Sequence, residues 1–352
     1  MRKIILFFLF IFNVNFIFSQ NWQLVWSDDF DGNTLDSSKW KHDFGTGSQF
    51  GMWGWGNGEL QYYQSQNTFV SNGVATIEVK EEPNGLIDSW NNVSYYSSSK
   101  ISTKGLFDFR YGKVEARIKT IDGTGFWPAF WMLPSDGSWP CDGEIDIMEQ
   151  WGNDYLTNNT TGAAHIGSCP YSQSTHFYQS FGAYSSNGSF ADDFHKYAII
   201  WKEDTISWYV NDVEMFQITP QSYFSIPQPH QWPFNSNDWY IMINLAITQS
   251  GPNSNTVFPN NIQIDYVRVY KDISSTSIEN KNVSDVLVIS KNLLTYNTFK
   301  IANIKILDLN GRILLSEKKS GNISLSNLNQ GLYIIEALHV EGYKIHQKII
   351  KY

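Results

Sequence analysis

The chain has 352 residues, which is enough for one large domain and one small domain. It carries a net charge of −9, and we expect no nucleic-acid partner because nucleic acid requires a basic face. Residues 1–20 contain two basic and no acidic side chains, and residues 273–352 contain 10 basic and 6 acidic ones, so the acidic excess lies between these segments. All 14 tryptophans also lie there, where they suit either a hydrophobic core or the stacking of sugar rings.

Residues 1–20 have the pattern of a secretory signal peptide. Arg2 and Lys3 supply the positive start, and an apolar run follows over residues 4–18. The alternative is a membrane anchor, but two asparagines interrupt the run and it is short for a bilayer span. We therefore expect a secreted protein, extracellular or at the cell surface, with no membrane-spanning segment in the mature chain.

Residues 21–272 consist of short alternating runs separated by Gly, Asn, Asp and Ser. Period-two alternation occurs over residues 74–79, 113–118, 206–210 and 262–270. Repeated runs of this kind predict an all-β fold, an antiparallel sandwich, and we find no amphipathic helix of three turns. The first run, residues 24–26, and the last, residues 262–270, would bring both ends of the domain to one sheet.

The chain has two cysteines, Cys141 and Cys169, at a spacing that matches no zinc pattern. In an oxidising compartment such a pair can close a disulfide. Two free thiols are the alternative.

Three carboxylates lie within six residues, at Glu144, Asp146 and Glu149, among large apolar side chains. On a surface strand such close charges repel and gain nothing. Across a scissile bond they can supply the acid and the nucleophile of glycoside hydrolysis. The alternative is an acidic edge strand.

Spacing tests this hypothesis. Glu144 and Asp146 share a face of a strand by period two, whereas Glu149 falls on the opposite face unless a β-bulge near Met148 inserts one residue. With that bulge the glutamate carboxyls approach to roughly 5–6 Å, close to the separation in retaining enzymes. We predict that Asp146 hydrogen-bonds Glu144 and that the three groups titrate together. Spacing alone leaves open which glutamate is the nucleophile.

Residues 273–284 are polar and predict a linker, and residues 285–352 predict a small β-sandwich-like domain. Its alternating runs cover residues 304–309, 312–316, 331–337 and 344–350. Asn310-Gly311 between two such runs is typical of a hairpin.

The catalytic motif resembles that of glycoside hydrolase family 16, in its laminarinase-like branch. Further segments that resemble the family, in the same order, are residues 26–32, 57–63, 113–117, 125–134 and 265–270. The resemblance covers residues 22–271. It implies a β-jelly-roll sandwich with a concave substrate cleft, and a mechanism that requires no cofactor.

The resemblance also implies the role of each residue. Glu144 would be the nucleophile, Glu149 the acid/base and Asp146 the assisting residue of a double displacement. Trp127 and Trp131 would stack sugars along the cleft, with core packing as the alternative.

Asn57 would hydrogen-bond a sugar hydroxyl, and His165 would lie on the neighbouring strand near Glu149, with a structural histidine as the alternative. Lys100 stands where the family usually has arginine, and residues 247–253 lack the tryptophan that many laminarinase-like members have there. Both departures concern the substrate-binding side, so they affect the preferred linkage and not the chemistry.

A structural calcium ion (Ca²⁺) on the convex face is common in this family. The matching positions here are Asp29, Gly73 through its carbonyl, and Asp265. Carboxylate and carbonyl oxygens are ligands that suit calcium, and the ion would stabilise the chain by binding only the folded state.

The C-terminal unit resembles the type IX secretion sorting domain, on residues 304–312, 325–328, 331–333 and 344–351. This resemblance predicts the type IX secretion machinery as a partner. The alternative is a small carbohydrate-binding sandwich, which the absence of tryptophan there disfavours.

The leading hypothesis is endo-hydrolysis of β-1,3-glucan such as laminarin. The same fold and chemistry could instead act on mixed-linkage β-1,3-1,4-glucan or a marine galactan. A non-catalytic glucan-binding protein is a third hypothesis, and the three retained carboxylates disfavour it.

Overall fold

The computed structural model describes residues 22–152, 159–185, 188–223, 232–273, 287–290, 293–296, 301–308, 311–318, 321–340 and 344–351. The predicted signal peptide and all but the first residue of the predicted linker lie outside these ranges. One compact unit comprises Trp22–Lys271, and a second begins at Asp272.

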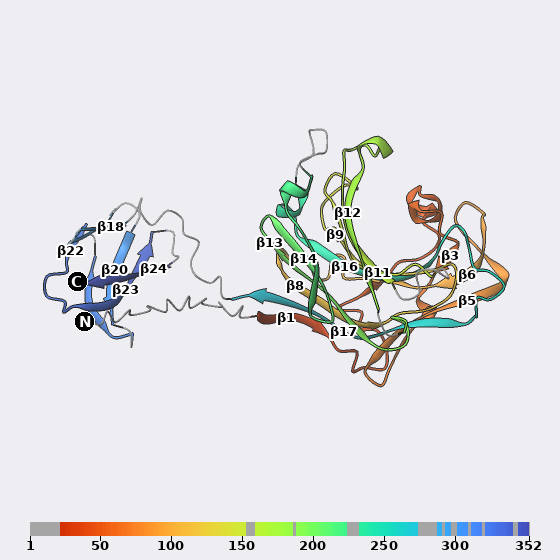
Figure 1. Cartoon of the computed structure of the whole chain (residues 1–352), viewed down its shortest axis with the longest axis horizontal. Helices are drawn as coiled ribbons and strands as arrows, with labels where there is room; N and C mark the ends of the chain where they lie inside the picture. Colours follow the sequence, from red (N-terminus) through yellow and green to blue (C-terminus); the bar gives the residue numbers. More distant parts are fainter. Residues whose placement is uncertain are drawn as a thin grey trace, which may run out of the picture. The chain divides into compact units, whose positions relative to one another are not determined.

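The first unit is a sandwich of two sheets, as Figure 1 shows. In the first sheet the strand order is β15 (Val213–Ile218), β14 (Thr205–Val210), β13 (His195–Lys202), β8 (Gly112–Lys119), β17 (Asn260–Asp272), β5 (Val74–Ile87), β6 (Val93–Ser98) and β3 (Gln61–Tyr63), while β1 (Trp22–Asp28) pairs with β17 and β4 (Thr68–Ser71) with β5. The pairing of β1 with β17 confirms that both ends of the domain meet in one sheet.

The second sheet has the order β12 (Phe177–Tyr184), β11 (Asn159–Ile166), β10 (Glu144–Glu149), β9 (Phe126–Pro134), β16 (Trp239–Ile247), β7 (Lys100–Ser102) and β2 (Lys41–His42). The described part of the chain has no α-helix, only the 3₁₀ turns η1 (Ser48–Phe50), η2 (Trp53–Gly56), η3 (Ser65–Asn67), η4 (Gln173–Thr175), η5 (Pro220–Tyr223) and η6 (Pro233–Asn235). The predicted all-β sandwich is confirmed. Within the described ranges, no helix is long and apolar enough to cross a membrane.

The two sheets enclose one hydrophobic core, and the alternation of side chains along β9 shows how it forms. Phe126, Phe130 and Met132 are buried in the core, while Trp127 and Trp131 are only partly buried. Each buried phenylalanine or methionine stabilises the fold by about 1.5–3 kcal/mol relative to exposure. The two tryptophans therefore project from the outer face of this sheet.

The second unit contains two small sheets. One joins β18 (Leu287–Ser290), β19 (Leu293–Tyr296) and β22 (Asn322–Ser324), and the other joins β21 (Ile313–Glu317), β20 (Ile301–Leu307), β23 (Gly331–His339) and β24 (Lys344–Lys351). Leu294 and Tyr296 of the first sheet share a core with Ile304 and Ile335 of the second. The hairpin of β20 and β21 was predicted, whereas β18 and β19 were not, because their runs are short and do not alternate.

Candidate active site

Strand β10 contains the predicted β-bulge. Asp146 and Glu149 are three residues apart, but their partners on β11, Ala163 and Thr161, are only two apart. The register with β9 shifts between Asp146 and Met148, so the extra residue lies at Ile147–Met148. The bulge turns Glu149 away from the core, and Met148 is buried in its place.

A tryptophan from the other sheet supports this bulge. Trp208 of β14 is completely buried, and its indole Nε1 donates a hydrogen bond of 2.8 Å to the backbone carbonyl of Asp146. Gly162 on β11 lies against the same point, where a Cβ atom would come within 2.8 Å of the Trp208 ring and 2.9 Å of that carbonyl. Thr160 donates to the carbonyl of Glu149 at 3.2 Å. The polar backbone of the bulge is therefore hydrogen-bonded at both ends.

The three carboxyl groups share the outer face of the seven-stranded sheet, which we call the carboxylate face. Polar atoms of Glu144, Asp146 and His165 all lie within 4.8 Å of one another, and His165 Nε2 is 3.0 Å from Asp146 Oδ2. Trp127 Nε1 donates a hydrogen bond of 2.9 Å to Glu149 Oε1. The predicted side chains thus converge from β9, β10 and β11.

The acids of the carboxylate face hold protons more strongly than usual. Burial is the main reason that the pKa of Glu144 and of Glu149 rises to about 8 and that of Asp146 to about 7. The charge of Asp146 raises the pKa of both glutamates further. A hydrogen bond with Glu144 lowers the pKa of Asp146, as the sequence led us to expect. Such close groups titrate as a coupled set.

The surroundings of the two glutamates differ, although His165 lowers the pKa of both. The charge of Glu149 raises the pKa of Glu144 and Lys100 lowers it, whereas the Trp127 hydrogen bond lowers the pKa of Glu149. The cation of Lys100 therefore favours ionisation of Glu144.

Lys100 of β7 is buried next to two aromatic rings from other parts of the chain. Its Nζ lies 4.4 Å from the ring centroid of Trp55 and 5.0 Å from that of Trp131, and 3.6 Å from Asp43 Oδ2. Trp131 Nε1 in turn donates a hydrogen bond of 2.7 Å to Asn244 Oδ1. A cation held between two indole faces and one carboxylate is fixed in place.

Glu59 extends this network, although the sequence did not point to it. Its carboxylate accepts hydrogen bonds from Asn57 at 3.3 Å, from Gln61 at 2.6 Å and from Tyr63 at 3.0 Å. Burial raises the pKa of Glu59, and Lys100 lowers it. Asn57, the predicted sugar ligand, is therefore linked to a buried carboxyl group and is itself exposed.

On the other side of β10, His165 continues into a second histidine. His165 Nδ1 lies 2.9 Å from His176 Nε2, and the two ring planes are 18° apart. Burial lowers the pKa of His176, and so does His165. His176 was not predicted, because nothing local marks it.

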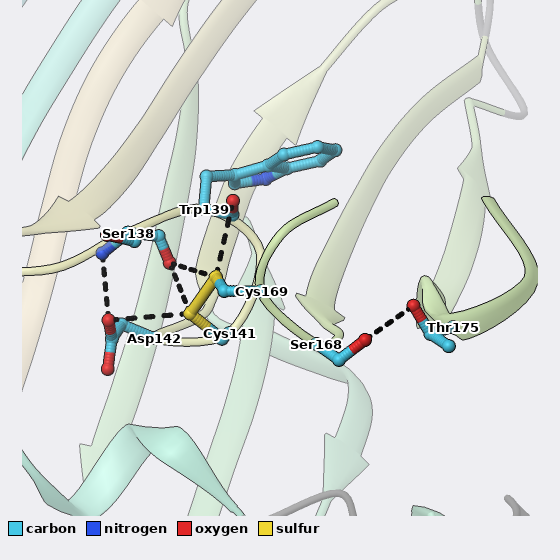
Figure 2. Close-up of a disulfide and its surroundings, with 7 residues drawn as sticks. All are labelled: Ser138, Trp139, Cys141, Asp142, Ser168, Cys169 and Thr175. Atoms are coloured by element: carbon cyan, nitrogen blue, oxygen red, sulfur yellow. Dashed lines mark hydrogen bonds between the residues drawn. A yellow bond between two sulfur atoms is a disulfide. The ribbon is translucent and has the colours of Figure 1, made fainter. Parts of the chain in front are cut away.

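Cys141 and Cys169 are joined by a disulfide with Cα atoms 5.6 Å apart. Figure 2 shows it between the segment before β10 and the one after β11, with Ser138 and Trp139 beside it. The bridge therefore ties the segment before β10 to the segment after β11.

Comparison with known proteins identifies the fold. Residues 56–267 match the model described as glycosyl hydrolases family 16. The chain belongs to glycosyl hydrolase family 16. Residues 281–352 of this family 16 chain match a secretion system C-terminal sorting domain of the type IX system, so the protein is secreted or held at the cell surface. Both resemblances noted in the sequence are confirmed.

The family 16 chain is similar to several glucanases. Glucan endo-1,3-beta-glucosidase A1 of Niallia circulans is 38% identical over 266 residues, which are 71% of this chain but only 38% of that protein. The catalytic domain of an endo-1,3-beta-glucanase (laminarinase) from Thermotoga petrophila is 36% identical with a TM-score of 0.65, covering 72% of this chain and 100% of that one. SCLam, a non-specific endo-beta-1,3(4)-glucanase, is 33% identical with a TM-score of 0.60, covering 71% and 91%.

The residues assigned to calcium by the family 16 resemblance do not form a preformed cation site. Asp29 accepts hydrogen bonds from Arg268 at 2.5 and 3.1 Å, and Asp265 accepts one from Arg117 at 2.8 Å. Gly73 lies in the two-residue turn between β4 and β5. Two guanidinium groups already neutralise the two carboxylates, so this arrangement does not fit the ion.

Proposed function

We propose that this chain is a secreted retaining endo-glycosidase that hydrolyses β-1,3-glucan such as laminarin. The observation that carries the proposal is the bulge in β10, which places Glu149 on the same face as Glu144 and Asp146. An acid and a nucleophile on one face can act on the two sides of a single glycosidic bond.

In the proposed reaction, Glu144 attacks the anomeric carbon while Glu149 donates its proton to the leaving oxygen. The glycosidic bond breaks and a covalent glycosyl ester forms on Glu144. Water then attacks the same carbon, Glu149 takes the water proton, and Glu144 leaves as a carboxylate. The configuration at the anomeric carbon is retained.

This division of roles follows the family 16 resemblance, because spacing alone left it open and burial raises the pKa of both glutamates to about 8. Lys100 favours the ionised form of Glu144, and the raised pKa of either glutamate would keep a proton available for a leaving group. The Trp127 hydrogen bond orients the Glu149 carboxyl. Asp146 hydrogen-bonds Glu144, so it can hold a proton when the neighbouring charge changes.

Two kinds of relative support a glucan substrate. The Niallia and Thermotoga proteins are named for β-1,3-glucan, whereas SCLam is named for β-1,3(4)-glucan, so mixed-linkage glucan is the second candidate. A marine galactan would use the same carboxylates. A purely glucan-binding role is disfavoured, because the three carboxyl groups and their supports are all present.

The test is hydrolysis of laminarin, lichenan and agarose by the full chain, with the anomeric configuration of the first products followed by NMR. We expect laminarin to be cleaved fastest, with β-configured products. Glu144→Gln should abolish turnover and retain laminarin binding, and Glu81→Gln, which changes an exposed glutamate of β5, should have no effect. Absence of activity on every β-1,3-glucan would refute the proposal that β-1,3-glucan is the substrate. Products of α configuration would refute the retaining mechanism.

A further inference from the structure

A group of exposed aromatic rings lies at the β12 edge of the carboxylate face and has no part in the proposed chemistry. Trp139 is 41% exposed, Tyr171 52% and Tyr178 58%. Trp139 precedes β10, Tyr171 lies between β11 and β12, and Tyr178 lies on β12. Three large rings gathered in solvent are an unusual use of apolar surface and indicate a binding site.

These rings form one continuous surface. The centroids of Trp139 and Tyr171 are 5.0 Å apart, and His176 lies 5.0 Å from Trp139 and 6.3 Å from Tyr178. These separations are those of directly contacting aromatic rings. We call Trp139, Tyr171, His176 and Tyr178 the aromatic platform.

The aromatic platform is joined to the carboxyl groups. His165 is stacked on Tyr178 with centroids 5.2 Å apart, and its ring nitrogens approach His176 on one side and Asp146 on the other. His165 also pairs directly with Glu144 across β10 and β11. A chain bound at the carboxylates and extending toward β12 would therefore meet the platform next.

The disulfide holds the platform in place. Cys141 follows Trp139 by two residues and Cys169 precedes Tyr171 by two, so the bridge fixes both ring-bearing segments. Cys169 Sγ lies 3.8 Å from the carbonyl oxygen of Trp139, a contact drawn in Figure 2. A Cβ on Gly167 would come within 2.4 Å of Pro140, so the two segments are in close contact. Rings fixed in this way lose little conformational freedom when a ligand binds.

We propose that the aromatic platform binds the sugar units of a β-glucan that extend past the scissile bond over β11 and β12, and that the Cys141–Cys169 disulfide keeps it in the binding geometry. The inference rests on the proposed function. The apolar C–H faces of the glucose units in a neutral polysaccharide suit the faces of these aromatic rings. The opposite end of the face, around Trp131 and Lys100, differs in holding a cation.

The experiment compares a long and a short substrate, laminarin and an aryl β-laminaribioside, which is too short to cover both ends of the face. Trp139→Ala and Tyr171→Ala should each lower kcat/KM on laminarin about tenfold through KM, and leave the short substrate within about twofold. The double variant Cys141→Ser with Cys169→Ser should reproduce this selective loss. Tyr95→Ala, which removes an exposed tyrosine of β6 in the other sheet, is the matched control and should change neither.

Each outcome decides between the ideas. If the wild-type protein cleaves laminarin and the ring variants match it on both substrates, the proposed binding role of the aromatic platform is refuted and the proposed function stands. Equal losses on both substrates also refute that binding role, because they indicate a general structural effect. Absence of wild-type activity on both substrates refutes the proposed function. A double cysteine variant that keeps full laminarin activity refutes the role of the disulfide alone.

Discussion

Replacing Trp208 with phenylalanine should lower both the stability and the turnover of the enzyme. The change leaves the buried Asp146 carbonyl without its 2.8 Å hydrogen bond, at a cost of about 1–3 kcal/mol. The smaller ring leaves a cavity that costs about 1–2 kcal/mol more. For a unit of this size we expect the Tm to fall by about 5–15 °C.

Turnover should fall for a separate reason. Without the indole, the bulge between Asp146 and Met148 loses the contact that holds it against the other sheet, and Glu149 moves relative to Glu144. A displacement near 1 Å can cost about a hundredfold, so we expect kcat on laminarin to fall between about tenfold and a hundredfold. The assay is kcat at 25 °C, together with circular dichroism to show that the variant is folded.

Trp201→Phe is the matched control. Trp201 of β13 is also completely buried, and it donates a 2.9 Å hydrogen bond to a backbone carbonyl, that of Phe234. Its Tm should fall by a similar amount and its kcat should stay within about twofold of the wild type, because the Phe234 carbonyl is not on β10. Equal kcat in the two folded variants would refute the idea that Trp208 positions the bulge.

Three further predictions follow from the charges. Because burial raises the pKa of Glu149 from 4.5 to about 8, the folded state keeps a proton that the unfolded chain releases, so this group destabilises the fold as pH rises through that window. The free energy of unfolding of Glu149→Gln should therefore match that of the wild type at pH 4 and exceed it at pH 8, by on the order of 2 kcal/mol after allowance for partial solvent access. If the variant and the wild type had equal Tm values at pH 8 as well as at pH 4, the pKa shift would be contradicted. Trp127→Phe removes a hydrogen bond that favours the ionised form of Glu149, so the alkaline limb of the kcat/KM profile should move up by about one pH unit. An unmoved limb would mean that Trp127 does not tune the acid. Since Arg268 and Arg117 already pair with Asp29 and Asp265, EDTA should leave the Tm within about 2 °C of its value in calcium. A larger rise of the Tm in calcium would contradict this expectation and support the calcium site predicted from the sequence.

The sequence predicted those features that depend on neighbours along the chain. The spacing of Glu144, Asp146 and Glu149 required one extra residue, and the structure has it at Ile147–Met148. With only two cysteines, one pairing was available. The expectation that Trp127 and Trp131 lie on one side of the sheet came from the family 16 resemblance, and both project from the outer face of β9.

What the sequence could not predict are contacts between distant residues. Trp208 is 62 positions from Asp146, and Arg268 is 239 positions from Asp29. A tryptophan in an alternating strand reads as core, and nothing local shows where its N–H group points. The same holds for His176, whose partner His165 lies on β11. The hydrogen-bond partners of Glu59 are its neighbours along the chain, and only the charge of Lys100 reaches it from a distant strand.

The bulge leads us to expect that activity depends on packing between the two sheets. A regular strand satisfies its backbone within its own sheet, but an inserted residue leaves ladder groups without their usual partners. Here one of these groups is satisfied by Trp208 from the opposite sheet, and Gly162 provides the space for that ring. We therefore expect the separation of Glu144 and Glu149 to depend on the packing between the sheets as well as on β10. Substitutions that loosen the core around Trp208 should therefore reduce kcat before they unfold the protein, whereas equal loosening near Trp201 should not.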